Sequence, residues 1–126
     1  MPGPDDAIRE LIDAFSQRDE DRIRATLSED IAAYITNAEG GVDRVDGREP
    51  YVRRLLALQA PELSISVTQS VTVAPDQALA MVEIRAARKG RSLHNFAGFL
   101  ARVDSGQITE LWMVEALPAY SDEFWQ

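Results

Sequence analysis

The stretch FLARVDSGQITELWMVEALP, residues 99–118, decides the fold of this chain. Two apolar segments flank the polar sequence DSGQ, and this arrangement is typical of two antiparallel strands joined by a hairpin turn. Apolar residues occupy both alternating sets of positions in each segment, so neither face of the strand pair is expected to be left exposed to water. The stretch therefore predicts part of a sheet that is covered on both faces.

Three further strands are predicted upstream. DIAAYITN, residues 30–37, is interpreted as the first strand. Residues 63–73 alternate between apolar and polar side chains with the period of a strand, and residues 78–88 follow after the turn APDQ. A hairpin through Lys89-Gly90 then connects to the strand SLHNFAGFLARV, in which Gly98 is expected to mark a bulge or bend.

Three helices are predicted in the first half of the chain. Residues 4–15 place apolar side chains at helical spacing behind two acidic residues, which favour the positive end of the helix dipole. Asp19 is positioned to cap a short second helix. Pro50 suits the first turn of a third helix, which closes before Pro61. The element order α-α-β-α-β-β-β-β predicts a single α+β domain over residues 1–126, with helices packed on one face of a bent antiparallel sheet.

The composition excludes several classes of function. The 126 residues contain no cysteine and one histidine, so thiol chemistry, disulfides and multi-histidine zinc sites are excluded, and no metal site is expected. A net charge of −8 argues against a nucleic-acid partner. No apolar run approaches the roughly 18 to 20 residues that span a bilayer, and the N-terminus does not read as a signal peptide. We therefore expect a cytoplasmic protein without a membrane partner.

The second apolar face of the predicted sheet needs cover of its own. Helices on one face of so small a sheet leave the other face open, and a broad exposed apolar patch normally marks an interface. Trp112 and Val114 have the parity of this outer face. A second copy of the chain is the simplest cover, so we expect a homodimer that packs sheet to sheet through these two residues.

The chain resembles the nuclear transport factor 2-like superfamily, specifically its SnoaL-like members. The resemblance is carried by LIDAFSQRDEDRIRATLSEDIAAYI, VDGREPYVRRLL and FLARVDSGQITELWMVEALP, and it covers essentially the whole chain. Ketosteroid isomerases and polyketide cyclases share this fold. The resemblance implies a cone-shaped domain, in which a strongly curved antiparallel sheet wraps around the helices and leaves a pocket between sheet and helices. Such domains are usually dimeric.

The resemblance also bears on catalysis. Leu11 and Ile35 stand where ketosteroid isomerases carry a tyrosine and an acidic base, so steroid isomerisation of the familiar kind is not implied. Polyketide cyclases hold an acidic residue at about the level of Glu115, and the same alignment directs Leu111, Met113 and Glu115 inward. A carboxyl group in a dry cavity has a raised pKa and becomes a general base near neutral pH. The alternative is that Glu115 forms a structural ion pair with an arginine such as Arg85 or Arg102.

Four more polar residues are candidates for the site. His94 titrates in a range that suits acid–base catalysis, although its place near a hairpin favours a solvated, non-catalytic histidine. Tyr34 and Asn37 are able to donate hydrogen bonds to a ligand carbonyl, although Tyr34 equally suits packing in the core. Glu83 is expected to line the pocket as an internal ion pair with Arg85.

Two functions remain open at this stage. The first is a cofactor-independent isomerase, cyclase or dehydratase that acts on a small apolar carbonyl compound, with Glu115, His94 and Tyr34 as its catalytic residues. The second is a non-catalytic ligand-binding or association module. In either case the side chains expected to contact the ligand are Asn37, Leu11, Phe15, Ile35, Tyr51, Leu55, Met81, Glu83, Phe96, Leu111 and Met113.

Overall fold

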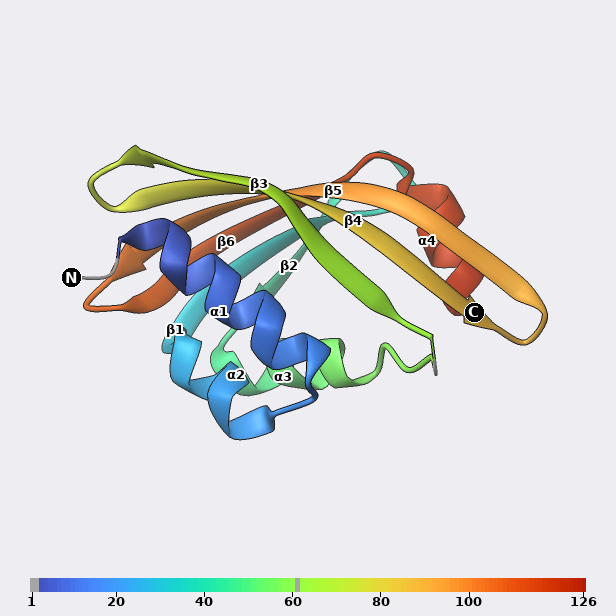
Figure 1. The fold of residues 1–126 in the computed structure, drawn as a ribbon, viewed down its shortest axis with the longest axis horizontal. Helices are drawn as coiled ribbons and strands as arrows, with labels where there is room; N and C mark the ends of the chain where they lie inside the picture. The colour runs from blue at the N-terminus through green and yellow to red at the C-terminus, as the bar shows by residue number, and fades with distance from the viewer. Residues whose placement is uncertain (1–2, 61) are drawn as a thin grey trace.

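A computed structural model describes residues 3–60 and 62–126 of the chain. Figure 1 shows a curved sheet with α1, α2 and α3 beneath one of its faces and α4 near the β4–β5 hairpin. The elements in chain order are α1 (Pro4–Ser16), α2 (Glu20–Thr26), β1 (Leu27–Thr36), β2 (Val42–Asp46), α3 (Arg48–Leu56), β3 (Ser64–Ala74), β4 (Gln77–Arg88), β5 (Arg91–Asp104), β6 (Gln107–Glu115) and α4 (Pro118–Trp125). The predicted α+β class and the sheet curved around helices are confirmed.

The six strands form one open sheet in the order β2-β1-β6-β5-β4-β3. Neighbouring strands are antiparallel except for β1 and β6, which pair in parallel. The expectation of a wholly antiparallel sheet was therefore wrong at this one pair. The parallel pair joins the first and last strands of the chain, and it brings the end of β6 next to the end of β1.

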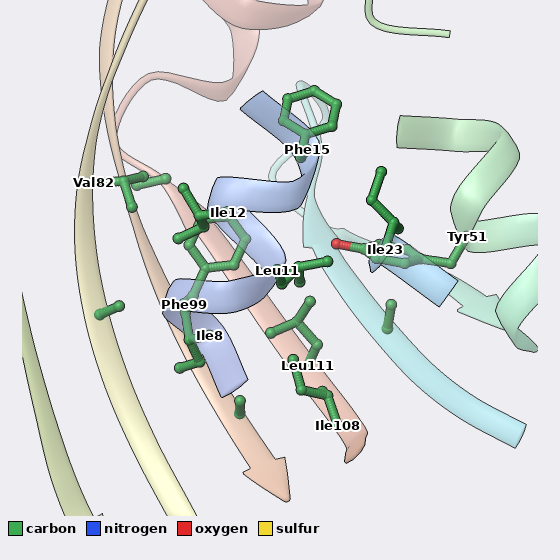
Figure 2. Packing of buried hydrophobic residues seen from close by; sticks show 14 of the residues in the cluster. Ile8, Leu11, Ile12, Phe15, Ile23, Tyr51, Val82, Phe99, Ile108 and Leu111 are labelled. Carbon is green, nitrogen blue, oxygen red and sulfur yellow. The ribbon is translucent and has the colours of Figure 1, made fainter. Parts of the chain in front are cut away.

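Helix α1 supplies the largest share of the core from the helical layer. Pro4 begins the helix, and the Gly3 backbone N–H donates to Asp6 Oδ2 at 2.7 Å, which satisfies one of the free donors at this end. The apolar stripe packs onto the inner sheet face, where it meets side chains such as Phe99 and Leu111 (Figure 2). The stripe consists of Ile8, Leu11, Ile12 and Phe15, as the helical spacing predicted.

Small side chains line the inner face of β4 and β5 beneath α1. Ala78, Ala80, Ala97 and Ala101 are at most 1% exposed. A methyl side chain lets the helix approach the sheet closely at these positions, and the side chains that alternate with the alanines along each strand point to the opposite face. This packing reverses the orientation expected for Met81 and Phe96.

Gly98 does not interrupt its strand. It pairs with Met81 on one side and Val114 on the other, and the register continues unbroken through it. The irregularity of the β5–β6 pair lies instead between Arg102 and Val103, beside the hairpin turn. The predicted bulge at Gly98 was therefore wrong, and the glycine instead leaves a hollow on the outer face between Met81 and Val114.

Two elements were not predicted. Strand β2 is a five-residue edge strand whose side chains are half-buried or exposed, so its sequence lacks the apolar alternation that marks a strand. Helix α4 was not predicted, because eight residues with mixed polarity give a weak helical signal. Its Phe124 is nonetheless buried, and Trp125 packs edge-on against it. Among the residues that the structure describes, no helix is long and apolar enough to cross a bilayer.

Candidate active site

A cavity of about 240 Å³ lies between the inner face of the sheet and helices α1, α3 and α4. Most of its wall is apolar, and its polar groups come from Tyr51, Arg54, Glu115, Ser121 and Asp122. The apolar lining residues are Phe15, Ile35, Leu55, Leu58, Leu63, Ile65, Ile84, Leu93, Met113 and Trp125. The curved sheet forms the roof of the cavity, and α4 closes the end where the carboxyl groups gather.

Glu115 is the last residue of β6 and faces this cavity. Its backbone N–H donates to Thr36 Oγ1 at 3.0 Å, and its Oε2 accepts from Asn95 Nδ2 at 3.3 Å. The alternative of a structural ion pair with Arg85 or Arg102 is wrong. These two arginines lie within 3.0 Å of Glu83 and 3.9 Å of Asp76, respectively.

The surroundings of Glu115 make its carboxyl group harder to ionise than an ordinary glutamate. Burial is the main cause and raises the pKa of Glu115. A hydrogen bond from Ser121 and the positive charge of Arg54 lower this pKa, whereas the negative charge of Asp122 raises it further. The net pKa is raised, and a carboxylate with a raised pKa is a stronger base than a solvated one.

Arg54 is held at the edge of the cavity by a short polar chain. Its Nη2 lies 3.2 Å from Asp43 Oδ2 of β2, and Asp43 Oδ1 accepts from Asn37 Nδ2 at 3.0 Å. These two contacts, first from Asn37 and then from Arg54, lower the pKa of Asp43. Asn37 Oδ1 accepts from the backbone N–H groups of Glu39 and Gly41. Asn37 was expected to contact the ligand, but its side chain is instead engaged in this turn and in supporting Asp43.

Tyr51 brings a phenol to the cavity from α3. Its side chain is almost fully buried, and Figure 2 shows the hydroxyl pointing from α3 toward α1. Desolvation raises the pKa of Tyr51, so the hydroxyl stays protonated at neutral pH. A neutral phenol in an apolar wall is able to donate a hydrogen bond to a carbonyl or enolate oxygen.

His94 and Glu83 lie on the outer face of the sheet, away from the cavity. The expectation that Glu83 lines the pocket was therefore wrong, and His94 is solvent-exposed, as its place near a hairpin favoured, and not a catalytic residue of this cavity. His94 Nε2 lies 2.6 Å from Glu83 Oε2, and Arg85 Nη2 lies 3.0 Å from the same oxygen. The hydrogen bond with His94 is the main cause of the lowered pKa of Glu83. The expected ion pair of Glu83 with Arg85 exists, but it is solvent-exposed and not internal.

Tyr34 also faces outward, contrary to expectation. Its ring stacks on Trp112 with a centroid distance of 4.1 Å and an interplanar angle of 12°, and the guanidinium of Arg44 lies 5.4 Å from the Tyr34 ring centre. The parallel pairing of β1 and β6 places Tyr34 directly beside Trp112. The parity of β1 thus directs Ile35 inward and Tyr34 to the outer face.

The predicted ligand-contacting residues separate into three groups. Those that line the cavity, together with Glu115, are Phe15, Ile35, Tyr51, Leu55 and Met113. Leu11 and Leu111 are buried in the core but do not line the cavity. Met81 and Phe96 are exposed on the outer face, because the residues on either side of each of them occupy the buried inner positions.

Sequence reasoning missed four polar residues of the site, Arg54, Asn95, Ser121 and Asp122. Arg54 is one of several arginines on a short helix, and Ser121 and Asp122 belong to the helix that was not predicted. Asn95 carried a usable signal, because its parity with Leu93 and Ala97 places an amide on the apolar inner face. The residues described contain no cluster of three or more side chains with metal-ligand chemistry.

The raised pKa of Glu115 predicts a pH-dependent gain of stability for Glu115→Gln. An acid whose pKa is raised on folding is ionised more easily in the unfolded chain. The stability of the wild type is therefore highest below the pKa that Glu115 has in the unfolded chain, and it falls as the pH rises through the higher pKa that Glu115 has in the folded protein. Glutamine does not ionise. We expect the variant to have a melting temperature a few degrees above that of the wild type at pH 8, and no such difference near pH 4. Calorimetry at both pH values measures this, and an equal difference at the two values would contradict it.

A comparison with protein families matches residues 8–111 to the SnoaL-like domain. The chain belongs to the SnoaL-like family. The resemblance inferred from the sequence is therefore confirmed, and the match spans α1 through most of β6. Comparison with curated proteins gave no match.

Solved structures with the same fold have diverse activities. A protein assigned as a SnoaL-like polyketide cyclase from Jannaschia sp. CCS1 is 18% identical, with 94% of this chain and 89% of that chain covered and a TM-score of 0.77. An LEH-like epoxide hydrolase of M. tuberculosis is 15% identical, with 96% and 88% covered and a TM-score of 0.77. A computationally designed 17-OHP binder is 18% identical, with 90% and 91% covered and a TM-score of 0.70. At these identities, the similarity establishes the fold of this SnoaL-like domain and not its activity.

Proposed function

We propose that this SnoaL-like domain is a cofactor-independent enzyme that moves a proton on a small, largely apolar carbonyl compound, with Glu115 as the general base. The observation that carries the proposal is the position of Glu115. Its carboxyl group lies in a mostly apolar cavity, burial raises its pKa, and no arginine forms a close ion pair with it among the residues described. Cyclases and hydrolases are among the proteins with this fold, which supports a catalytic use of the cavity.

The chemistry requires only the groups that line the cavity. Glu115 removes a proton from the carbon next to the carbonyl. The electron pair of the broken C–H bond forms a double bond to the carbonyl carbon, and the π electrons of the carbonyl group move onto its oxygen to give an enolate. Tyr51 and Ser121 are the candidate donors to this oxygen. The protonated Glu115 then returns the proton to a different carbon in an isomerisation. In an aldol cyclisation, the enolate carbon instead attacks a second carbonyl, whose oxygen takes the proton.

The size of the cavity restricts the substrate. Pockets for drug-sized ligands measure about 300–1,000 Å³. At about 240 Å³, this cavity is below that range and favours a compact molecule over an elongated steroid or multi-ring polyketide. Aromatic and aliphatic walls favour a ring or short chain that is mostly hydrocarbon, with the reacting carbonyl group near Glu115.

The proposal is tested by proton exchange, which needs no knowledge of the natural product. Small cyclic and linear ketones are incubated with the purified protein in D₂O, and loss of the α-proton signal is followed by NMR. We expect exchange of at least one compact ketone at about 10²-fold or more above the rate in buffer, which is the lower end of general-base catalysis. Binding of ketones without exchange, or no effect on any of them, would refute the enzymatic proposal.

A non-catalytic binding module is the second candidate. The observation in its favour is that Tyr34 and His94, two expected catalytic partners, lie on the outer face. A computationally designed 17-OHP binder also has this fold, which supports a ligand-binding use of the cavity. Native mass spectrometry of the purified protein distinguishes the two candidates, because a tightly held apolar molecule that is released unchanged supports a carrier.

The outer face of the sheet supports a homodimer in either case. Large side chains form a row across the strands through cross-strand pairs, and all of them are at least 37% exposed in the single chain. The row consists of Trp112, Leu100, Leu79 and Val71. A second copy of the chain covers this row in our proposal, with Trp112 at one end of the row and Val114 beside it on the same strand face. We also propose that the dimer acts in the cytoplasm, since the chain has no cysteine that would benefit from an oxidising compartment.

A further inference from the structure

Asn95 is the most deeply buried polar residue near the cavity. Its side chain is 1% exposed and stands on the inner face of β5, between apolar residues that pack under the helices. Burying an amide without partners is costly, so a residue of this kind persists only where its hydrogen bonds are satisfied. The hydrogen-bond partners of the Asn95 amide therefore indicate its role.

The amide of Asn95 uses all of its hydrogen-bonding capacity. Its Nδ2 donates to Glu115 Oε2 at 3.3 Å and to the Leu117 carbonyl oxygen at 3.2 Å. Its Oδ1 accepts from the backbone N–H groups of Leu117 at 3.2 Å and Phe96 at 2.9 Å. The two backbone N–H groups require an acceptor, and this requirement assigns the oxygen end of the amide to them. The nitrogen end must then face Glu115.

The partners of Asn95 belong to two functional parts of the site. Glu115 is the candidate general base, and Leu117 is the residue directly before helix α4. Helix α4 places Ser121, Asp122 and Trp125 on the cavity wall. One buried side chain thus connects the carboxyl group to the start of the helix that closes the cavity over it.

We propose that Asn95 is a positioning residue, which orients the Glu115 carboxylate toward the cavity and fixes the point where α4 begins. This inference rests on the proposed function of Glu115 as a base. Other elements also contribute charged or titratable groups around Glu115, namely Asp122 from α4 and Tyr51 and Arg54 from α3. Among the described polar side chains around the Glu115 carboxyl group, only Asn95 also forms hydrogen bonds with the backbone of Leu117, in the segment that connects β6 to α4.

The inference is tested by the titration of Glu115, measured by NMR of its side-chain carboxyl carbon and assigned with Glu115→Gln. Asn95→Leu removes the donor to the carboxylate, and Asn95→Asp replaces it with an acid while retaining an acceptor for the Leu117 N–H. We expect the titration midpoint of Glu115 to rise by about one pH unit in each variant, because an ionised carboxylate loses a hydrogen bond. In Asn95→Leu alone, we also expect amide hydrogen exchange in α4 to accelerate by about tenfold or more.

Thr26→Val is the matched control. Thr26 is a buried polar residue whose Oγ1 donates to the Ile23 carbonyl oxygen at 2.8 Å, and it lies outside the cavity lining. Its replacement destabilises the fold through the loss of a buried hydrogen bond but is expected to leave the Glu115 midpoint unchanged. A change of less than about 0.3 of a pH unit in both Asn95 variants would overturn the inference.

A measurement on the wild type makes the test independent of variant folding. The side-chain amide signals of Asn95 should shift with the same pH midpoint as Glu115, and signals that do not follow Glu115 would also overturn the inference. These titrations do not involve turnover. If they succeed while no ketone exchanges its proton, the positioning role stands and the enzymatic proposal fails.

Discussion

Glu115→Gln is expected to lower kcat/KM for α-proton exchange by about 10²- to 10⁴-fold, the contribution that a positioned general base makes. Glutamine has nearly the same size and still accepts a hydrogen bond from Asn95, so the shape of the cavity is retained. It cannot take up a proton. The loss is therefore expected in kcat, while KM changes little. Steady-state kinetics of wild type and variant on the fastest-exchanging ketone measure both parameters.

Glu110→Gln is the control for this prediction. Glu110 lies on the same strand and accepts from Trp112 Nε1 at 3.2 Å, outside the cavity. Its variant should retain wild-type activity. In the wild type, kcat/KM should increase with pH as Glu115 ionises, with a midpoint above that of an ordinary glutamate, and Glu115→Gln should lose this limb. Equal rates for the Glu115 and Glu110 variants would show that Glu115 is not the base.

Leu100→Lys is expected to convert the proposed homodimer into a monomer. Leu100 is paired with Leu79 on one side and Trp112 on the other, in the middle of the outer apolar row. A sheet-to-sheet dimer would bury the lysine ammonium without a partner, at a cost of several kcal/mol. We expect the dissociation constant to rise by about 100-fold or more, as measured by analytical ultracentrifugation over a concentration series.

Gln59→Lys makes the same change of charge on the exposed surface of the chain after α3 and should leave the dimer intact. The folded state of Leu100→Lys is checked by circular dichroism, since Leu100 is exposed in the single chain and its replacement leaves the core in place. A wild-type protein that sediments as a monomer at about 100 μM would contradict the homodimer proposal. A dimer that persists in Leu100→Lys would place the interface on another surface.

The orientation of the last strand was predicted from the family resemblance, whereas the orientations of β4 and β5 were predicted wrongly. Large apolar residues occur on both faces of β6, so local alternation does not decide which face is inward, and the inward direction of Leu111, Met113 and Glu115 was what the resemblance implied. In β5, apolar side chains again occur on both faces. Phe96 was expected to contact the ligand, whereas the next residue, Ala97, occupies the inner position under α1.

The polar part of the site depends on elements that are distant in the sequence. Asn95 and Glu115 are separated by 20 positions and meet because β5 and β6 are antiparallel neighbours. Arg54 reaches the cavity edge from α3 through its contact with Asp43 on an edge strand that has no clear sequence pattern. Neither relation is visible in local periodicity, which reports the burial of a residue and not the identity of its neighbour.

The α+β class, the amphipathic stripe of α1 and the hairpins could be predicted from the sequence, because each depends on the local alternation of apolar and polar side chains. The inward direction of Glu115 followed from the family resemblance. Only the tertiary structure decided which residues surround that carboxyl group. Helix α1 approaches a row of alanines on the inner face, which leaves Met81 and Phe96 on the outer face, and the parallel pairing of β1 with β6 placed Tyr34 against Trp112 and away from the cavity. Both results follow from how closely separate elements can pack, a property of pairs of elements that no single segment encodes.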